Sequence, residues 1–494
     1  MPTIPFPALR ALALAPAAVL LAGLSPGAGA QPAAAEPTAC TDFHAFVNKD
    51  WMAANALPGP GIATASALQE LRELTSRQQR ELLDAAMAAP GNERQQALGN
   101  FWASGLDEAA VEAAGAQPIA PLLSRIDGIR RARDIPGVIA EVHQAGIPVA
   151  FEFNAGLDLA DPTRYIGYFT QGGLGLPGPE YYSRQDADTG ALLDRYRGYV
   201  RAILGLTGVP EAELDAQTAA VIDLERHLAA RWQPLAQMSD PRNNHALVEA
   251  SSLRGQFRNL RLDQFLKALD VGAPQVSLAN PDLFATLDYL VANNPVEQWK
   301  PYLRFHVANA MAPYLSQPFR DAEFEFHGRV LRGDAAPAGR PEQVLAAINK
   351  AAGPLLAQEY VAAHLPQATR ERAQTVASQV RDALAQAVAR SEWMDPASRA
   401  EAGRKLEALQ IEVGAPEWPQ DTALPRIGRE SFGANMLAAS AWRHAREMDR
   451  IGAASASRRW DVLPQEPAVA YDMARNQLVV TAADCQTRTV HELN

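Results

Sequence analysis

The segment ALQELRELTSRQQRELLDAAMAA, residues 67–89, contains the pattern that decides the fold class. Leu68, Leu71, Leu82 and Leu83 recur at helical spacing among charged side chains, which is typical of an amphipathic helix with one face in a core. The segment RERAQTVASQVRDALAQAVARSEWM, residues 370–394, repeats the pattern. We therefore predict that both segments are core helices of a mainly α-helical protein.

Similar periodicity runs through residues 192–206, 212–231 and 341–364, with proline and glycine clusters between them. One segment differs: in VAFEFNAGLDLADPTRYIGYFTQGG, residues 149–173, aromatic side chains alternate on either side of DLADPT. This pattern is typical of two strands joined by a turn. The sequence thus predicts a large multi-helix domain with a small β-hairpin, and a minor strand content at residues 478–480.

Length and charge exclude several classes of function. The 494 residues exceed the roughly 250 to 300 at which single cores stop growing, so several domains or one large helical assembly are expected. The chain carries 45 basic and 56 acidic residues, a formal charge of -11, and no basic block. Nucleic acid and anionic membrane surfaces are therefore not expected as partners.

The first thirty residues have the features of an export signal. Arg10 precedes the apolar stretch ALALAPAAVLLAG, which is too short to span a bilayer, and AGA at residues 28–30 is a small-x-small cleavage pattern. We predict a signal peptide at residues 1–30 and a flexible mature N-terminus at residues 31–41. The mature protein would be periplasmic or secreted, with no membrane attachment after cleavage.

The chain has two cysteines, Cys40 and Cys485, near its opposite ends. In an oxidising compartment they are compatible with one long-range disulfide or with two separate thiols, because sequence does not show proximity. A lipid anchor on Cys40 is a further alternative, although the preceding EPTA lacks the apolar residue that such a site needs. A cysteine-ligated metal site is not supported.

Known catalytic and cofactor motifs are incomplete or missing in this sequence. Gly173, Gly175 and Gly178 match G-x-G-x-x-G, but Pro177 and Pro179 stand where a dinucleotide site needs a helix to begin, so we predict a rigid turn. No G-x-S-x-G nucleophile elbow occurs. The histidines are too far apart for a zinc pair one helical turn apart, and those beside YLRF and FEF are expected to be structural. They are His44, His143, His227, His245, His306, His327, His364, His444 and His491.

Four segments resemble the neprilysin and PepO family of zinc metallopeptidases. CTDFHAFVNKDWMAANALP (40–58) is similar to the opening of the family, and GGLGLPGPEYY (172–182) to its glycine-proline turn with paired tyrosines. YLRFHVANAMAPYLSQPFRDAEFEFHGRVLRG (302–333) resembles its helix followed by F-x-F, and EWMDPASRAEAGRKLEALQIEVGAPEWP (392–419) resembles the end of its helical domain. The matches follow the family order, which makes them specific as a set.

The resemblance implies a helical domain at residues 42–420 that caps a thermolysin-like α+β catalytic domain. Residues 421–494 would be the truncated beginning of that catalytic domain. In the family, zinc and a glutamate base of H-E-x-x-H activate water, with further groups later in the chain. The two domains enclose a chamber that admits short peptides, so short peptides are the expected partners.

Residues 460–483, WDVLPQEPAVAYDMARNQLVVTAA, resemble the start of that catalytic domain, with Asn476 and Ala482 in place. The family has an Asn-Ala-Tyr-Tyr strand that grips the substrate backbone, whereas residues 468–471 read Ala-Val-Ala-Tyr. The substrate-binding asparagine is therefore missing, which argues against peptide binding along this strand.

The final residues, TVHELN, raise the question of a zinc motif. His491 and the following Glu492 match the start of H-E-x-x-H, but no second histidine follows and the preceding residues share nothing with the family. We interpret the match as a coincidence. No residue of the chain is assigned a catalytic, substrate-binding or metal role, and although zinc is the cofactor of the family, we predict that this chain binds none.

Two interpretations of function remain. The first is a secreted zinc metalloendopeptidase for short peptides that is truncated and inactive as written. The second is a periplasmic pseudoenzyme, or a helical module that binds peptides or proteins. An unrelated helical scaffold is disfavoured by the ordered motifs. The sequence indicates neither the oligomeric state nor the peptide specificity. We also expect residues beyond 420 to form a protease-sensitive tail, because SAWRHAREM (440–448) and NQLVV (476–480) would lack packing partners.

Overall fold

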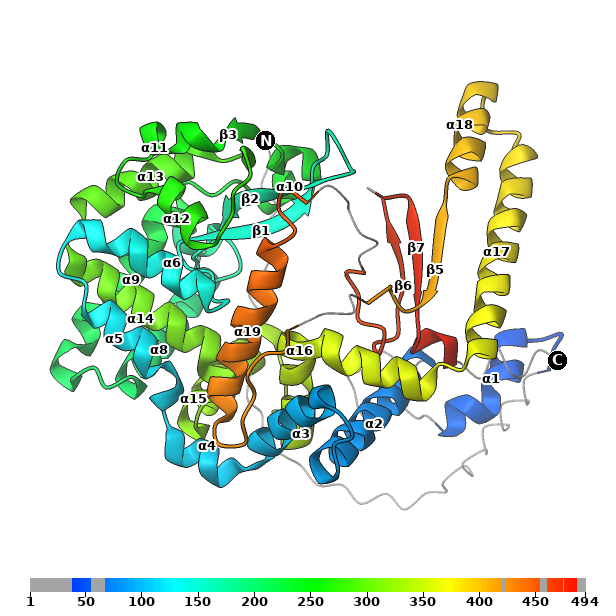
Figure 1. Ribbon diagram of the computed structural model, residues 1–494, viewed down its shortest axis with the longest axis horizontal. Coiled ribbons are helices and arrows are strands. Elements are labelled where there is room, and N and C mark those ends of the chain that lie inside the picture. The colour runs from blue at the N-terminus through cyan, green and yellow to red at the C-terminus, as the bar shows by residue number, and fades with distance from the viewer. Residues whose placement is uncertain (1–37, 55–66, 419–422, 454–459, 474, 487–494) are drawn as a thin grey trace, which may run out of the picture. The chain divides into compact units, whose positions relative to one another are not determined.

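The computed structural model describes residues 38–54, 67–418, 423–453, 460–473 and 475–486 (Figure 1). The chain divides into two compact units, residues 1–66 and 67–494. The first unit contributes helix α1 (Phe43–Ala54). The predicted signal peptide and most of the predicted flexible N-terminus lie outside the described residues, as does His491. The proposed domain boundary at residue 420 stays a prediction.

Helices dominate the second unit, as predicted (Figure 1). The five predicted helices are all present, with ends within a few residues of the expected ones. Several begin at a side chain that accepts a hydrogen bond from the first turn, such as Asn92, Asp186 and Asp395. The helices are α2 (Ala67–Ala88), α3 (Glu93–Leu106), α4 (Glu108–Ala114), α5 (Ala120–Asp127), α6 (Ile135–Gln144), α7 (Glu180–Ser183), α8 (Ala187–Leu206), α9 (Glu211–Ala229), α10 (Leu235–Met238), α11 (Leu253–Gln256), α12 (Leu262–Ala268), α13 (Pro281–Asn293), α14 (Val296–Met311), α15 (Gln317–Glu323), α16 (Arg340–His364), α17 (Gln367–Ala389), α18 (Pro396–Glu407) and α19 (Phe432–Met448).

The predicted hairpin forms part of a four-stranded sheet with the order β1-β2-β4-β3. Strands β1 (Phe151–Leu157) and β2 (Tyr165–Gln171) pair antiparallel, β2 pairs parallel with β4 (Gln275–Leu278), and β3 (Leu247–Glu249) pairs antiparallel with β4. Phe153 lies directly opposite Phe169, and their ring centroids are 4.5 Å apart. This aromatic pair explains why the alternating pattern forms a strand pair.

A second sheet has three strands in the order β5-β7-β6. Strand β5 (Gln410–Gly414) runs parallel to β7 (Gln477–Thr481), and β6 (Val469–Asp472) runs antiparallel to it. The expected strand at residues 478–480 is thus present as β7. Because β7 lies in the centre, β6 is an edge strand.

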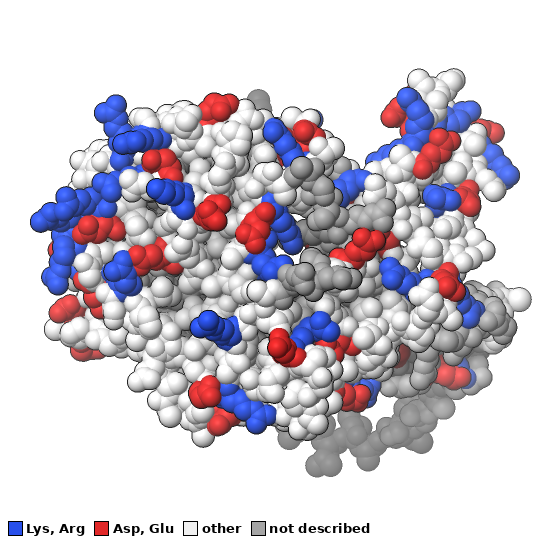
Figure 2. Space-filling view, viewed as in Figure 1, with Lys and Arg blue, Asp and Glu red and all other residues white. Residues whose placement is uncertain are grey.

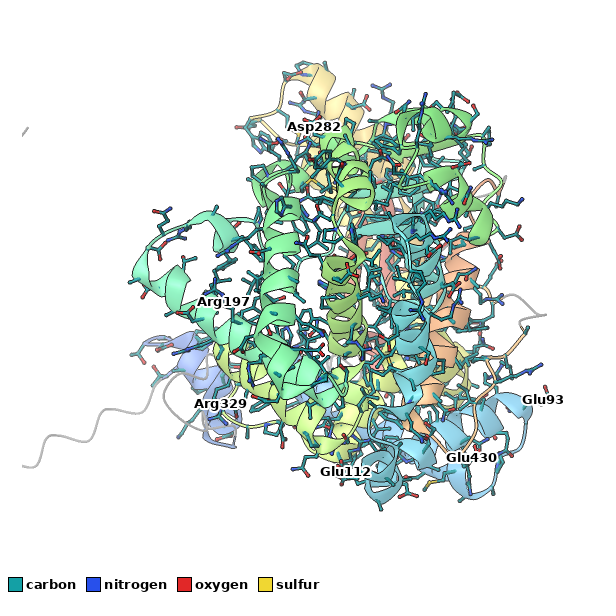
Figure 3. All side chains as sticks on the ribbon, turned by 90° about the vertical axis from the view of Figure 1, so that its left-hand side faces the viewer. Glu93, Glu112, Arg197, Asp282, Arg329 and Glu430 are labelled. Atoms are coloured by element: carbon teal, nitrogen blue, oxygen red, sulfur yellow. The ribbon has the colours of Figure 1, made fainter. Side chains whose placement is uncertain are left out.

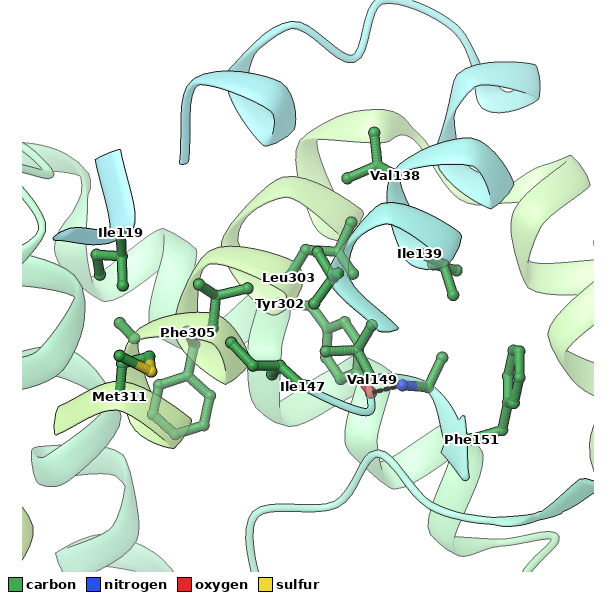
Figure 4. Close-up of a cluster of buried hydrophobic side chains, with 14 of the residues drawn as sticks. Ile119, Val138, Ile139, Ile147, Val149, Phe151, Tyr302, Leu303, Phe305 and Met311 are labelled. Atoms are coloured by element: carbon green, nitrogen blue, oxygen red, sulfur yellow. Dashed lines mark hydrogen bonds between the residues drawn. The ribbon is translucent and has the colours of Figure 1, made fainter. Parts of the chain in front are cut away.

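One large hydrophobic cluster fills the helical body between the first sheet and α14 (Figure 4). Val149, Phe151, Tyr302 and Leu303 are at most 1% exposed and belong to this cluster. The hydroxyl of Tyr302 accepts a hydrogen bond from the Ala150 N–H at 3.1 Å. The buried tyrosine therefore fixes the entry of β1 as well as filling space.

Helix α16 is kinked, and its neighbours satisfy the carbonyl groups that the kink releases. Ala352 has φ -130° inside the helix, two residues before Pro354. Pro354 has no N–H to donate to the carbonyl oxygen of Lys350, and Nη1 of Arg443 in α19 donates to this oxygen at 2.7 Å. The proline thus creates a site at which α19 binds α16.

The prediction that residues beyond 420 lack packing partners is wrong. Phe432, Met436 and Ala439 of α19 are at most 2% exposed and belong to the main hydrophobic cluster. The NQLVV segment lies in β7 between two strands. Both segments find partners among the helices and strands of the same compact unit, which the local sequence could not show.

The prediction that residues 370–394 form a core helix is also wrong. The segment is helical, but Ala377 is the one buried residue of α17 among those described, and Val376, Val380 and Leu384 are 46%, 61% and 50% exposed. The described segments that contact α17 most are α18, β5 and the short turn at Asp484–Gln486. In α2, Leu71 and Leu83 are buried as predicted, whereas Leu68 is 41% exposed because it lies in the first turn.

Candidate peptide-binding groove

The glycine-rich turn at residues 172–178 is a structural element built on a buried carboxylate. Gly173 has φ +81°, and its carbonyl accepts a hydrogen bond from the Tyr302 hydroxyl at 2.8 Å. A Cβ at Gly175 would collide with the hydroxyl of Tyr196. The segment forms a turn, as predicted, and Gly173 and Gly175 have conformational or steric reasons that do not involve a ligand.

The carboxylate beneath this turn is Glu225, which is fully buried in α9. The hydroxyl groups of Tyr182 and Tyr196 donate to it at 3.0 and 2.8 Å, and Nε2 of His306 lies 2.9 Å from it. Burial and the nearby carboxylate raise the pKa of both tyrosines well above its ordinary value. His306 is thus a structural histidine, as predicted, and the tyrosines serve as permanent donors.

A groove runs from the β1-β2 hairpin to the edge strand β6. Its part at the hairpin has a volume of about 350 Å³, and its part at β6 about 230 Å³. The two parts share Asp461, Asp472 and Arg475. The remaining lining residues come from the hairpin, the segment before β3, β6 and β7. They include Leu157, Tyr165, Tyr168, Met238, Asn244, Ala470, Tyr471 and Val479.

Arg475 lies at the centre of this groove and joins the two sheets. Its Nη1 donates to Asp472 at 2.9 Å and lies 3.9 Å from Asp461. Its Nη2 donates to the hydroxyl of Tyr165, and the guanidinium lies 5.8 Å from the centre of the Tyr165 ring. The side chain is only 12% exposed, so this cation is held in place and shapes the floor of the groove.

The hairpin wall of the groove is fixed at its tip by Asp158. Its carboxylate is fully buried and accepts hydrogen bonds from Arg164 at 2.6 and 2.9 Å, and Nε2 of His245 lies 2.8 Å from it. Burial alone would raise the pKa of Asp158, but hydrogen bonds from the Ala160 N–H, Arg164 and His245 outweigh burial and lower it. The carboxylate is therefore ionised at neutral pH and holds the turn to the segment before β3.

The edge strand β6 has backbone groups that point out of the sheet, away from β7. The Thr481 N–H donates to the carbonyl of Ala468 at 3.0 Å, and hydrogen-bonded pairs alternate along an antiparallel ladder. The backbone groups of Val469 and Tyr471 therefore point away from β7. No backbone partner for them occurs in the described ranges, and their side chains are 62% and 43% exposed.

The described residues contain no group of three His, Cys, Asp or Glu side chains placed to hold a metal ion, so by themselves they do not fit the zinc of a metallopeptidase. His143 and His306 are buried, and His327 is half-buried. Burial lowers the pKa of His143 and of His327 to about 4. His143 and His327 are therefore neutral at pH 7, and all three histidines serve the structure.

The two cysteines differ in their exposure to solvent. Cys40 is exposed, Cys485 is buried, and both are free thiols. Burial raises the pKa of Cys485 to about 11, which makes it a poor nucleophile. None of the helices in the described part of the chain combines the length and the apolar composition needed to cross a bilayer.

The sequence profile of peptidase family M13 matches residues 39–416, about three quarters of the chain. This chain belongs to peptidase family M13. The neprilysin- and PepO-like resemblance is thereby confirmed, as is a mainly α-helical fold. Family M13 consists of zinc metallopeptidases, so zinc is the cofactor of the family.

Two relatives of this M13 chain come from animals. Human endothelin-converting enzyme-like 1 is 26% identical over 399 residues, which cover 77% of this chain and 51% of the relative. Neprilysin-3 of Drosophila melanogaster is 22% identical over 481 residues, 91% of this chain and 60% of the relative. The chain thus spans about half the length of the first of these relatives.

Solved structures agree with the fold. The open state of the Mycobacterium tuberculosis zinc metalloprotease Zmp1 has a TM-score of 0.81 and 27% identity, and the match covers 90% of this chain and 69% of that one. PepO from Lactobacillus has a TM-score of 0.79 at 17% identity and covers 91% of this chain and 71% of that one. At that identity the second likeness shows the fold alone.

The residues that shape the groove of this M13 chain were missed by sequence reasoning. Arg475 and Tyr165 are 310 positions apart, and neither belongs to a spaced catalytic motif. The available signal was the charged pair Asp472 and Arg475 next to a predicted strand, because charged side chains beside an edge strand often have a specific partner. His491, the one candidate of the zinc motif, lies outside the described residues.

Proposed function

We propose that this chain forms the peptide-binding part of a secreted or periplasmic zinc metallopeptidase of family M13, and that residues 1–494 bind short peptides without cleaving them. The observation that carries the proposal is the edge of β6, where the backbone groups of Val469 and Tyr471 point away from β7. An extended peptide can add to such an edge as a further strand, with main-chain hydrogen bonds providing affinity. Export rests on the signal features of residues 1–30.

The groove suits a short peptide beside this edge. Its two parts have volumes of about 350 and 230 Å³, which accommodate a few side chains rather than a folded protein. Tyr168 and Leu157 supply apolar surface at one end, and the acidic side chains of Asp461 and Asp472 flank Arg475. The missing asparagine at position 468 removes one side-chain contact but leaves the backbone of β6 intact.

Cleavage would need groups that these residues do not supply. The 494 residues contain no H-E-x-x-H, and the described part offers no cluster of three metal ligands. A metallopeptidase needs zinc, a base and stabilising groups together. We therefore place binding, and not hydrolysis, in this chain.

A second candidate function is a pseudoenzyme or a binding module for peptides or proteins in the periplasm. It is favoured by Ala468, which stands where the family has its substrate-gripping asparagine. Its backbone N–H instead donates to the Thr481 hydroxyl at 3.0 Å within the same sheet. The two functions share peptide binding and differ in whether a zinc-bearing part acts with this chain.

Fluorescence anisotropy with a labelled, uncharged pentapeptide in the presence of EDTA tests the proposal. Val469→Pro removes the outward N–H at the first residue of β6, where proline is tolerated in a strand, and should abolish binding. Val469→Ala keeps the N–H and should retain it. Equal binding by both variants would exclude the β6 edge as the site. Stoichiometric zinc after dialysis, with peptide cleavage that EDTA stops, would refute binding without hydrolysis.

A further inference from the structure

A second groove, distinct from the one at β6, lies between the C-terminal end of α9 and the outer face of α13. Its volume is about 800 Å³. It shares no lining residue with the groove at β6. The residues that line it are Arg226, His227, Ala230, Arg231, Asp282, Ala285, Thr286, Tyr289, Leu290 and Asn294.

One wall of this outer groove carries positive charge. Arg226 and His227 lie in the last turn of α9, and Arg231 follows the end of the helix. Asp223 lies 3.6 Å from Arg226 and compensates part of its charge. The guanidinium of Arg231 makes no hydrogen bond or ion pair with any described residue. Figure 2 shows lysine and arginine side chains along the left-hand edge of the molecule, where α9 lies in Figure 1.

The charge at the end of α9 has a partial structural explanation. Cations in the last turn of a helix interact favourably with its macrodipole, and this accounts for Arg226. Arg231 lies beyond the end of α9 at Ala229, so it is not needed for that role. A free arginine at the mouth of a groove is available for a ligand.

The opposite wall is a face of α13 with small side chains at its centre and one exposed aromatic side chain. Asp282, Ala285, Thr286 and Tyr289 follow one another at helical spacing on a single face of α13. Ala285 and Thr286 are small and leave room above the helix. Tyr289 is 63% exposed. Exposed tyrosine side chains are enriched at binding surfaces, so this exposure is consistent with a ligand here.

From these contacts we infer that the outer groove binds an acidic peptide segment, with its carboxylates toward Arg226 and Arg231 and an apolar side chain against Tyr289. Asp282, at the far end, repels a uniformly anionic ligand and favours a segment with acidic residues at one end only. Nucleic acid does not fit, because two arginines and a histidine beside Asp282 give too few phosphate contacts for a chain of net charge -11. This inference is independent of the proposed function.

The test uses the full chain and a fluorescein-labelled peptide with three acidic residues followed by a leucine, measured by anisotropy at low salt. Arg231→Ala should weaken binding about three- to fivefold, the range expected for an exposed ion pair. Tyr289→Ala should weaken it by a similar factor. Both positions are at the surface, so neither change should unfold the protein. Added salt should weaken binding further, since exposed charges are screened.

Two controls make the result specific. Arg329→Ala removes an exposed arginine that pairs with Glu325 elsewhere on the same side of the molecule, as the labels of Asp282 and Arg329 in Figure 3 show. It should leave binding unchanged. A peptide with amides in place of the carboxylates should bind the unmodified chain no more tightly than the acidic peptide binds the Arg231→Ala variant.

Any of three outcomes would overturn the inference. Equal loss in Arg231→Ala and Arg329→Ala would show unspecific attraction to positive charge. Equal binding of the amide peptide would exclude charge recognition. Displacement of the peptide by inorganic phosphate at low millimolar concentration would show a site for small anions instead.

Discussion

Gln465 donates a hydrogen bond from its side-chain amide to the carbonyl oxygen of Gly353 at 3.0 Å, at the kink of α16. The same Nε2 donates to Oδ1 of Asn349 at 2.9 Å, and Gln79 in α2 donates to the carbonyl of Gln465 at 3.1 Å. Gln465 is completely buried. A backbone carbonyl at the kink of α16 thus anchors the segment that leads into β6.

Gln465→Leu should therefore loosen the segment before β6. Leucine is close in size but has no donor, so the Gly353 carbonyl and the Asn349 side chain would be buried with one partner fewer. We expect a loss of about 2 kcal/mol in the free energy of unfolding. Urea denaturation measures the loss, and hydrogen exchange of residues 460–483 shows where it acts. Glu466→Ala, at the exposed neighbouring position, is the control; an equal effect of both changes would contradict the anchoring role.

Asp158→Asn should release the tip of the β1-β2 hairpin. An amide keeps the shape but loses the charge that Arg164 and His245 contact, and we expect a cost of about 2 to 3 kcal/mol. The pKa of Asp158 is lower in the folded protein than in the unfolded chain. The ionised carboxylate therefore stabilises the fold above the pKa of the unfolded chain, and this stabilisation is lost as the pH falls through the pKa of the folded protein. Thermal unfolding at pH 7 and at pH 3 tests this: the difference between wild type and variant should shrink at pH 3. A difference that stays constant would show that charge is not the cause.

His143 predicts a loss of stability in mild acid. Its Nε2 accepts a hydrogen bond from the Val149 N–H at 3.1 Å, and burial lowers its pKa to about 4. In the unfolded chain this histidine binds a proton near its ordinary pKa of 6.5. Its contribution to stability is therefore fully present above pH 6.5 and decreases as the pH falls from 6.5 toward 4. From pH 7 to pH 5 we expect a loss on the order of 1 to 2 kcal/mol from this group.

The measurement is urea denaturation at the two pH values, with His143→Gln as the variant. The variant should be less stable at pH 7 but should lose less on acidification. Burial also lowers the pKa of His327 to about 4, so part of the pH dependence should remain in the variant. An unchanged pH dependence in the variant would exclude His143 as the cause.

The exposed face of α17 predicts tolerance to substitution. Val380 is 61% exposed, so Val380→Ser should change the free energy of unfolding by less than about 0.5 kcal/mol. Leu83→Ala, at a fully buried position of α2, should cost about 2 to 5 kcal/mol. Urea denaturation compares the two. A cost for Val380→Ser close to that for Leu83→Ala would show that this face is covered in solution.

The fold was predictable where the local pattern determines the structure. The alternation around DLADPT predicted β1 and β2, because Phe153 and Phe169 pair across the hairpin. The apolar spacing predicted α8, α9 and α16. The kink of α16 at Ala352 is a consequence of Pro354. The prediction treated residues 341–364 as one unbroken helix although this proline lies within them.

The candidate site was not predictable, because its contacts join segments far apart in the chain. Arg475 contacts Tyr165 across 310 positions, and no periodicity encodes such a contact. The amphipathic pattern of α17 likewise indicates an apolar face without telling what covers it, and Val380 is exposed. For α19 the error was the opposite: the ring of Phe432 packs 5.8 Å from that of Phe101 and 6.1 Å from that of Tyr314, both more than a hundred positions earlier in the chain.

Hydrogen exchange at β6 tests the central claim most directly. The full chain is incubated in EDTA with and without a short uncharged peptide, and the amides of residues 468–472 are followed by mass spectrometry together with the mass of the peptide. We expect that the amides of Val469 and Tyr471 gain protection when the peptide is added, that Val469→Pro prevents the protection of Tyr471, and that the peptide remains intact. Unchanged exchange at β6 with a saturating peptide would contradict the account.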